Sequence, residues 1–213
     1  WTGALCRQWQ KNDKEMKKIY SVLMLLAMLS ASMAFSSCNK EDNDTPEDAY
    51  AYLHRSFTGK LICQDESRTD SVVMDTLDAS WSINASNKLT IAHVPLVKML
   101  VGVDNAELIE AANAMATQTL AADVSVVHVT PIVFSVLPQA LTVAVRFGGS
   151  DHLLRITFAS GSNLSWGSYS VNDQSMVINI METGVYLDGS TTNLLPERKP
   201  LLWSTEQKVH PVM

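Results

Sequence analysis

The residues that could carry catalysis are scattered along the chain. No two of the five histidines have the spacing with which one helix or strand presents a metal-binding pair. The sequence contains no nucleophile elbow, zinc-protease helix, Walker loop or dinucleotide-binding fingerprint. Glu107 and Glu110 lie on one face of a predicted helix, whereas glycoside hydrolysis needs two carboxylates across a cleft. The sequence therefore predicts no catalytic residue, no metal site and no cofactor.

A site assembled from distant residues is the alternative. His93 and His128 lie in strand-like runs, where a histidine is usually half-buried and has no catalytic role. Together with Asp151 they would suit a small hydrolase or isomerase, provided that the fold gathers them in one pocket. Their convergence is the structural observation that separates an enzyme from a binding protein.

Two aromatic residues are candidates for contact with a ligand. Trp166 and Tyr169 belong to a stretch rich in glycine and serine, residues 160–170, which we expect to be a loop. Loops on a rigid scaffold often carry binding function, and exposed aromatic rings stack on sugars. The alternative is that Trp166 closes one end of a β core. Trp81 and Trp203 lie in predicted strands and are expected to pack in the core or at an edge.

Residues 16–37 have the layout of a secretory signal peptide. Lys17 and Lys18 are followed by a mostly apolar run and then by small, weakly polar residues. The apolar run is short and contains serine, which disfavours a membrane span. Residues 1–15 precede Met16 and are interpreted as an over-extended gene start. The alternative is a real extension that would turn the apolar run into a signal anchor.

The end of this segment reads Phe35-Ser36-Ser37-Cys38. It resembles the lipobox of bacterial lipoproteins, where a signal peptidase cuts just before the cysteine, although Phe35 stands at a position where leucine is usual. The resemblance implies that Cys38 becomes a lipidated N-terminus, and two or more acyl chains suffice for stable anchoring. A plain secretory signal with an incidental cysteine is the alternative.

The residues after this cysteine, NKEDND, form an acidic segment that is expected to stay extended. Lys40, Glu41 and Asp42 resemble the export signal of Bacteroidetes surface lipoproteins. The resemblance implies an outer-membrane protein, anchored in lipid through Cys38 and facing the cell surface. A position on the inward-facing side of the outer membrane is the alternative. Residues 38–47 are accordingly interpreted as a flexible tether.

Two further patterns concern modification of the chain. Asp70-Ser71-Val72 and Asp75-Thr76-Leu77 resemble the sites at which Bacteroidetes attach O-linked glycans to exported proteins. The resemblance makes Ser71 and Thr76 candidate glycosylation sites.

Charge restricts the partners of the protein. The 213 residues carry a formal net charge of −6, and an acidic surface repels phosphate backbones. Nucleic acid is therefore excluded as a partner, which leaves a glycan, a small molecule or another protein. With Cys6 and Cys38 assigned to the processed segments, Cys63 would be a single thiol, expected to be a small buried hydrophobe.

The remainder, residues 48–213, is predicted to be a single β-rich domain. A short helix follows Thr45-Pro46, and Asp104 is expected to cap a second helix with Glu107 at its third position. About eight short strands are predicted, with the clearest hairpin at residues 141–158. The expected fold is mainly β with an α+β tendency, as an antiparallel β-sandwich or partly open barrel with one helical insertion. A calycin-like barrel with an apolar ligand cavity is a further alternative.

The order of these features resembles an uncharacterised family of Bacteroidetes lipoproteins of about 200 residues. The matching segments are residues 95–101 with the helix after Asp104, the hairpin at 141–158, the stretch SGSNLSWGSYS and VYLDG. The resemblance to this family implies no catalytic residues. The resulting hypothesis is a lipid-anchored envelope protein that binds or has a structural role and does not catalyse a reaction.

Overall fold

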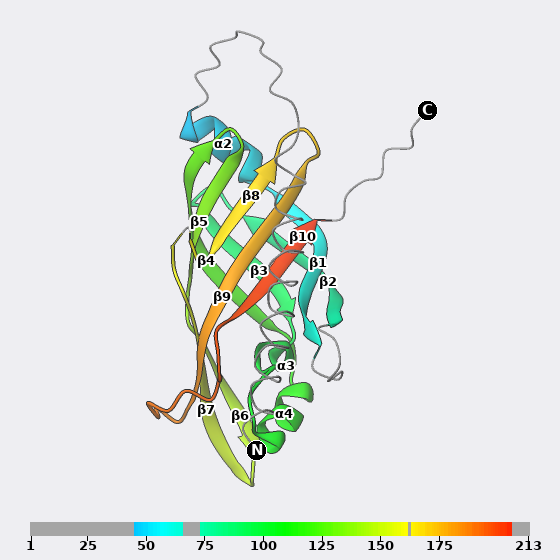
Figure 1. Cartoon of the computed structure of the whole chain (residues 1–213), viewed down its shortest axis with the longest axis vertical. Helices are drawn as coiled ribbons and strands as arrows, with labels where there is room; N and C mark the ends of the chain where they lie inside the picture. Colours follow the sequence, from blue (N-terminus) through cyan, green and yellow to red (C-terminus); the bar gives the residue numbers. More distant parts are fainter. Residues whose placement is uncertain (1–44, 66–72, 162, 206–213) are drawn as a thin grey trace, which may run out of the picture. The chain divides into compact units, whose positions relative to one another are not determined.

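A computed structural model describes residues 45–65, 73–161 and 163–205, all of which fall in one compact unit, Asn43–Met213. Strands dominate this unit, and the described part contains three short helices (Figure 1). The helices are α2 (Pro46–Leu53), α3 (Leu96–Met99) and α4 (Ala106–Asn113). The strands are β1 (Ser56–Asp65), β2 (Val73–Ile83), β3 (Lys88–Val94), β4 (Gln118–Val129), β5 (Ile132–Pro138), β6 (Leu141–Phe147), β7 (Ser150–Phe158), β8 (Trp166–Ser170), β9 (Ser175–Leu187) and β10 (Lys199–Thr205).

The ten strands form one antiparallel sheet in the order β10-β1-β2-β3-β4-β5-β8-β9-β7-β6, and β10 also pairs with β9. This additional pairing closes the first eight strands of that order into a barrel. Trp203 of β10 lies opposite Leu61 of β1 on one side and opposite Ile178 of β9 on the other. The path around the barrel follows chain order except that β6 and β7 are inserted between β5 and β8.

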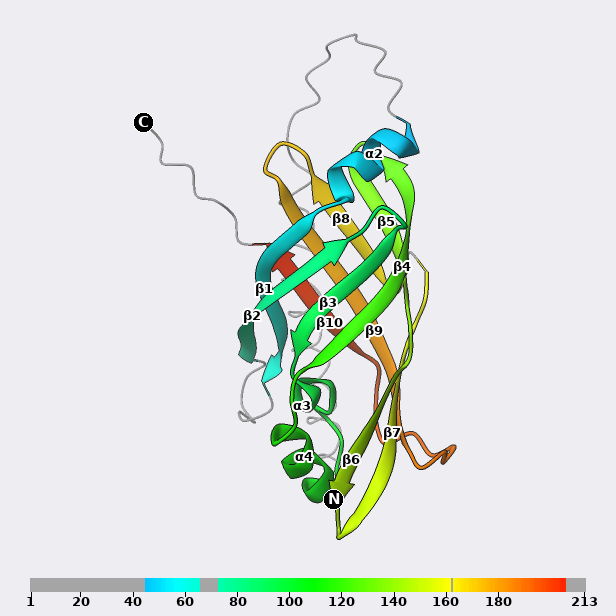
Figure 2. The ribbon, with the colours of Figure 1, turned by 180° about the vertical axis from the view of Figure 1, so that it is seen from behind.

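The inserted β6–β7 hairpin is joined to the barrel by pairing of β7 with the C-terminal half of β9. The first half of this 13-residue strand pairs with β8 and β10, and the second half pairs with β7. The hairpin thus continues the sheet past the end of the barrel (Figure 2). Helix α4 packs against β6, and the buried Leu108 and Ala112 of α4 belong to the same hydrophobic core as Val145 of β6.

Side chains fill the interior of the barrel. Strand β3 alternates between exposed and buried residues, as expected for a sheet with one solvated face. An eight-stranded barrel is only just wide enough for its side chains. The indole N–H of Trp81 on β2 donates to the sulfur of Met176 on β9 at 3.2 Å, which links two strands that are not neighbours. The largest of the other fully buried side chains are those of Phe134, Tyr169 and Trp203.

Helix α2 packs against one end of the barrel (Figure 1). Its N-terminus has a capping box between Thr45 and Asp48, and Pro46 occupies the first turn, as the sequence predicts. Ala49 and Leu53 are buried, and the hydroxyl of Tyr50 accepts a hydrogen bond from the backbone N–H of Val126 on β4 at 3.0 Å. Because the helix begins at Pro46, the last two residues of the segment expected as a tether are helical.

The expected fold class is confirmed, and the structure makes the architecture more definite. The fold is mainly β and its sheet is antiparallel. The sheet forms a closed barrel instead of a sandwich or a partly open barrel. The hairpin at residues 141–158 forms as predicted, with Phe147 opposite Ser150. The cap of α4 is Asn105 instead of Asp104, since the Asn105 side chain accepts from the N–H of Leu108.

The structure decides the roles of two further segments. The sequence places Trp203 either in the core or at an edge; its strand, β10, lies between β9 and β1 and completes the barrel, and Trp203 is buried. The stretch 160–170 was expected to be a loop, but its second half is strand β8, which pairs with β5 and β9. In the described part of the chain, no helix is both long and apolar enough to cross a membrane.

Candidate functional site

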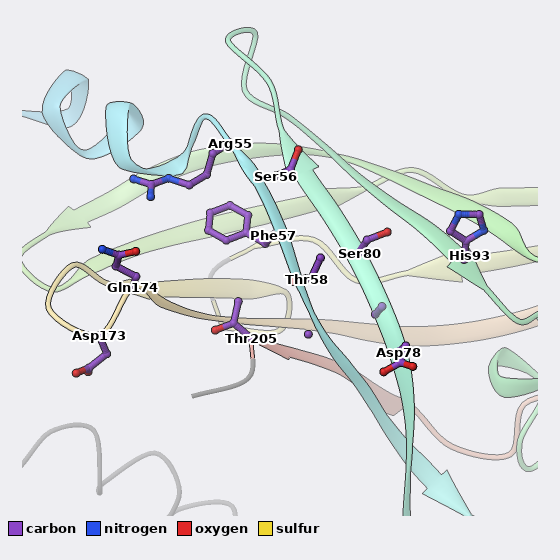
Figure 3. Close-up of a pocket in the computed structure, with 12 residues that line it drawn as sticks. Arg55, Ser56, Phe57, Thr58, Asp78, Ser80, His93, Asp173, Gln174 and Thr205 are labelled. Carbon is purple, nitrogen blue, oxygen red and sulfur yellow. The ribbon is translucent and has the colours of Figure 1, made fainter. Parts of the chain in front are cut away.

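A groove of about 770 Å³ lies on the barrel surface over β1, β2 and β3, and it extends to the turn between β8 and β9 (Figure 3). Alternation along the strands explains the outward-facing part of this lining, and the largely buried Phe57 also borders the groove. On β1, Phe57 and Leu61 point into the core, so Ser56 and Thr58 point outward. On β2, Trp81 is buried, and the neighbouring Ser80 lines the groove.

Hydroxyl groups form the middle of the groove. Thr58 and Ser80 are directly opposite each other on paired strands, which places their Cβ atoms about 5 Å apart. Ser56 lines the groove two residues before Thr58. Near the far end of β10, Thr205 also contributes to the lining, but its hydroxyl accepts from the N–H of Met176 at 2.9 Å. Ser56, Thr58 and Ser80 therefore offer the hydroxyls that remain open to a ligand.

Charged and amide side chains surround this hydroxyl row. Asp78 receives a hydrogen bond from Lys60 at 2.6 Å, and this bond with the charge of Lys60 lowers the pKa of Asp78. Asp78 therefore stays ionised at neutral pH. Arg55 and Gln174 lie together at one end of the groove and His93 lies at the other (Figure 3). Asp173 completes the set and accepts from the Ser170 hydroxyl at 3.0 Å.

An aromatic cluster supports the Arg55 end of the groove. Tyr169 is buried, and its ring stacks on Tyr52 with centroids 6.4 Å apart. Phe57 meets the same ring edge-on at 6.0 Å. The guanidinium of Arg55 lies 5.5 Å from the centre of the Tyr169 ring, which is within cation–π range. These contacts join α2 and β1 to β8 and hold Arg55 beside the groove.

A second polar feature is buried inside the molecule. Glu182 of β9 and Lys199 of β10 are cross-strand partners, with the Lys199 Nζ 3.5 Å from a Glu182 carboxylate oxygen. Lys199 also donates to the carbonyl oxygens of Met99 and Val101 at 2.9 and 2.7 Å. The lysine thereby attaches the segment after α3 to the end of the barrel.

The Glu182 carboxyl is fully buried, and its oxygens accept no hydrogen bond from the described residues. Desolvation raises the pKa of Glu182 to about 8, against the opposing effect of the Lys199 charge. Such a carboxyl can hold or release a proton near neutral pH. However, it is enclosed on all sides, so its role in the described structure is to join β9, β10 and the α3 segment.

The residues proposed for an enzymatic site do not converge. His93 lies at the end of β3, where Val94 is opposite Gln118, and His128 lies ten residues further along β4. At the usual rise per residue this is roughly 30 Å along the strand. Asp151 is exposed near the tip of the β6–β7 hairpin, where it pairs with Arg146 at 3.5 Å. Only His93 among the three lines the groove.

The two candidate binding aromatics lie on one strand with opposite orientations. Tyr169 points into the core, with 2% of its surface exposed, so it is Tyr169 that fills the barrel next to α2. Trp166 is half-buried and lies opposite Ser135 on β5 and Asn179 on β9. Neither residue lines the groove described above.

Of the candidate modification sites, Thr76 is exposed on β2 and accessible from solvent. The candidate residues for lipidation, for export and for the other glycosylation site lie outside the described residues; they are Cys38, then Lys40, Glu41 and Asp42, and Ser71. Within the described ranges, no three His, Cys, Asp or Glu side chains gather in a way that could hold a metal ion. Cys63 is buried, as the sequence predicts.

The sequence predicts neither the groove nor the buried ion pair. Ser56 and Thr58 alternate with buried residues, and this pattern identifies them as outward-facing but does not mark them as a site. Glu182 and Lys199 are 17 positions apart in the sequence, and only the pairing of β9 with β10 brings them together. A charged residue within the apolar run of β9 was the available signal for Glu182.

The fold and the groove define a closed antiparallel barrel with a polar site on its outer surface. The family model described as Domain of unknown function (DUF4840) matches residues 54–187, and the chain belongs to this family. The match covers β1 to β9 and therefore includes most of the groove. No curated protein and no solved structure matches the chain.

Proposed function

We propose that this chain is a lipid-anchored protein of the cell envelope, held in the outer membrane through Cys38 and displayed on the cell surface. Its barrel binds a ligand and does not catalyse a reaction. The lipobox-like sequence before Cys38 and the acidic residues after it support the anchor. A net charge of −6 disfavours nucleic acid, so the partner is a glycan, a small molecule or a protein.

One observation carries the binding proposal. The groove combines hydroxyl, amide and charged groups on the outer face of a rigid sheet, whereas the dispersed residues considered for catalysis do not meet. A volume of about 770 Å³ falls within the range of about 300–1,000 Å³ that small-molecule sites occupy. A surface with ligand-sized volume and no assembled catalytic group suits binding better than catalysis.

The calycin-like alternative has one observation in its favour, the closed eight-stranded barrel. In that alternative the ligand would be apolar and would lie inside the barrel. The interior positions are occupied by large side chains, including Trp81, Phe134 and Trp203. An interior ligand would have to displace them, so we place the ligand on the outer face.

The anchor is tested by intact-mass analysis of envelope-expressed wild type beside Cys38→Ala, combined with protease treatment of whole cells. We expect a lipid mass that depends on Cys38 and degradation of the wild type by external protease. An unlipidated product that is protected from protease would contradict the proposed anchor and location.

A further inference from the structure

The hydroxyl row of the groove has the chemistry of a saccharide site. Each hydroxyl of Ser56, Thr58 and Ser80 can donate one hydrogen bond and accept others. Sugar hydroxyls have the same dual capacity, so neighbouring groups can pair in either direction. The cross-strand pairing of Thr58 with Ser80 sets two such groups side by side, with their Cβ atoms about 5 Å apart, so that one sugar residue can contact both.

The ends of the groove add groups with fixed geometry. Arg55 presents a planar fork of N–H donors and Gln174 presents both a donor and an acceptor. The ionised Asp78 is a strong acceptor, since charged hydrogen bonds are stronger than neutral ones. Figure 3 shows Arg55 and Gln174 at one end of the hydroxyl row and Asp78 on β2, away from that end. A ligand that meets all of them must carry several hydroxyls along its length.

Charge and solvation exclude two other ligand classes. The charges at the groove balance, because Asp78 is paired with Lys60 and the carboxylate of Asp173 offsets the guanidinium of Arg55. With no net positive charge, the groove does not favour phosphate or sulfate. An apolar ligand would strip water from the hydroxyl row without replacing its hydrogen bonds, which is unfavourable. A neutral ligand with many hydroxyls satisfies both conditions.

We infer that the groove over β1, β2 and β3 binds a neutral oligosaccharide, with the hydroxyls of Thr58 and Ser80 as its central contacts. This inference rests on the binding role proposed above and names the ligand class. It does not depend on lipidation, because the groove lies entirely on the barrel.

The test uses the full chain, purified in detergent, on an array of neutral hexose and N-acetylhexosamine oligosaccharides. Sulfated and sialylated oligosaccharides are printed on the same array. The strongest binder is then titrated by calorimetry against wild type and the double variant Thr58→Val/Ser80→Ala. Valine keeps the shape of threonine and favours strands, so the variant removes hydroxyls and leaves the fold intact.

The matched control is Thr142→Val, which changes an exposed threonine on β6, outside the groove. We expect neutral oligosaccharide binding that weakens about tenfold or more in the double variant and is unchanged in the control. Three results would overturn the inference: no binding on the array, binding of anionic oligosaccharides alone, or equal affinity in all three proteins. The same titration of Cys38→Ala separates this inference from the anchor, since it should bind like wild type.

Discussion

Glu182 and Lys199 place two ionisable groups inside a core that is otherwise almost entirely apolar. Burying a charge is costly unless it is paired. Among the described residues, Lys199 donates to two backbone carbonyl oxygens and forms the ion pair with Glu182, whereas the carboxyl of Glu182 has the ion pair alone. The loss of solvation therefore destabilises mainly the ionised form of Glu182, which explains why its pKa is raised. Stability near neutral pH should therefore depend on the protonation of Glu182.

We predict that Glu182→Gln removes a decline in stability at rising pH. The pKa of Glu182 is about 8 in the folded protein, against an ordinary value of 4.5, so the folded state retains a proton that the unfolded state loses. The stabilising contribution is complete below about pH 4.5 and is lost as the pH rises through about 8, at up to roughly 1.4 kcal/mol per pH unit. Urea unfolding at pH 5, 6.5 and 8.5 measures it.

In this experiment the free energy of unfolding of wild type should fall relative to that of Glu182→Gln between pH 5 and 8.5. Parallel curves for the two proteins would show that the carboxyl is already ionised in the folded state across this range. Asp188→Asn is a control, because the pKa of Asp188 is lowered by its hydrogen bond with His152 and it titrates below the range studied.

The pairing of strands β1 and β10, which closes the barrel, depends on Gly59. A Cβ atom on Gly59 would lie 2.1 Å from the backbone oxygen of Ser204 on β10. Because the obstacle is backbone, it cannot turn aside as a side chain could. Strands β1 and β10 approach this closely only because position 59 has no side chain.

We therefore predict that Gly59→Ala separates β1 from β10 locally and destabilises the protein by about 3 kcal/mol, the upper end of the usual cost of overpacking. Thermal unfolding and amide exchange across the β1–β10 pairing measure the effect. Ser80→Ala, an outward-facing change on the next strand, should stay within about 0.5 kcal/mol of wild type. Normal stability of Gly59→Ala would show that the two strands are further apart than described.

The hydroxyl of Tyr50 joins helix α2 to β4, because it accepts a hydrogen bond from the N–H of Val126. Tyr50→Phe should leave the Val126 N–H without its acceptor and destabilise the protein by about 1–2 kcal/mol. The measurement is amide exchange at Val126, which should become faster. Tyr52→Phe is the matched control. Tyr52 is 40% exposed and its ring stacks on Tyr169, so this change removes a tyrosine hydroxyl from the same helix and leaves the bond to Val126 in place. Similar exchange at Val126 in both variants would contradict the role of this hydrogen bond.

The local elements were predictable because they depend on neighbouring residues. Alternation along residues 141–158 is enough to predict the hairpin, and Thr45-Pro46 is enough to predict the start of α2. The closed barrel was not predictable, since it requires β10 to pair with both β9 and β1 across long stretches of chain. The groove follows from this closure, because Thr205 joins Thr58 and Ser80 only when β10 lies beside β1.

At the scale of the whole barrel, the question is on which side of the sheet a ligand binds. The inner side is filled by indole, phenyl and aliphatic side chains, and the outer side over β1 to β3 has hydroxyls with open hydrogen-bonding capacity. The family match provides no function, so this contrast between the two faces of one sheet carries the proposal.

The most direct test is an NMR titration of the isotope-labelled chain in detergent with two probes in turn. The first is the oligosaccharide selected on the array and the second is a medium-chain fatty acid. We predict shifts at the amides of Ser56, Thr58 and Ser80 with the oligosaccharide, and no shift at the indole N–H groups of Trp81 and Trp203 with either probe. Shifts of these two indoles with the fatty acid, and none at the groove, would contradict it and identify an interior apolar site.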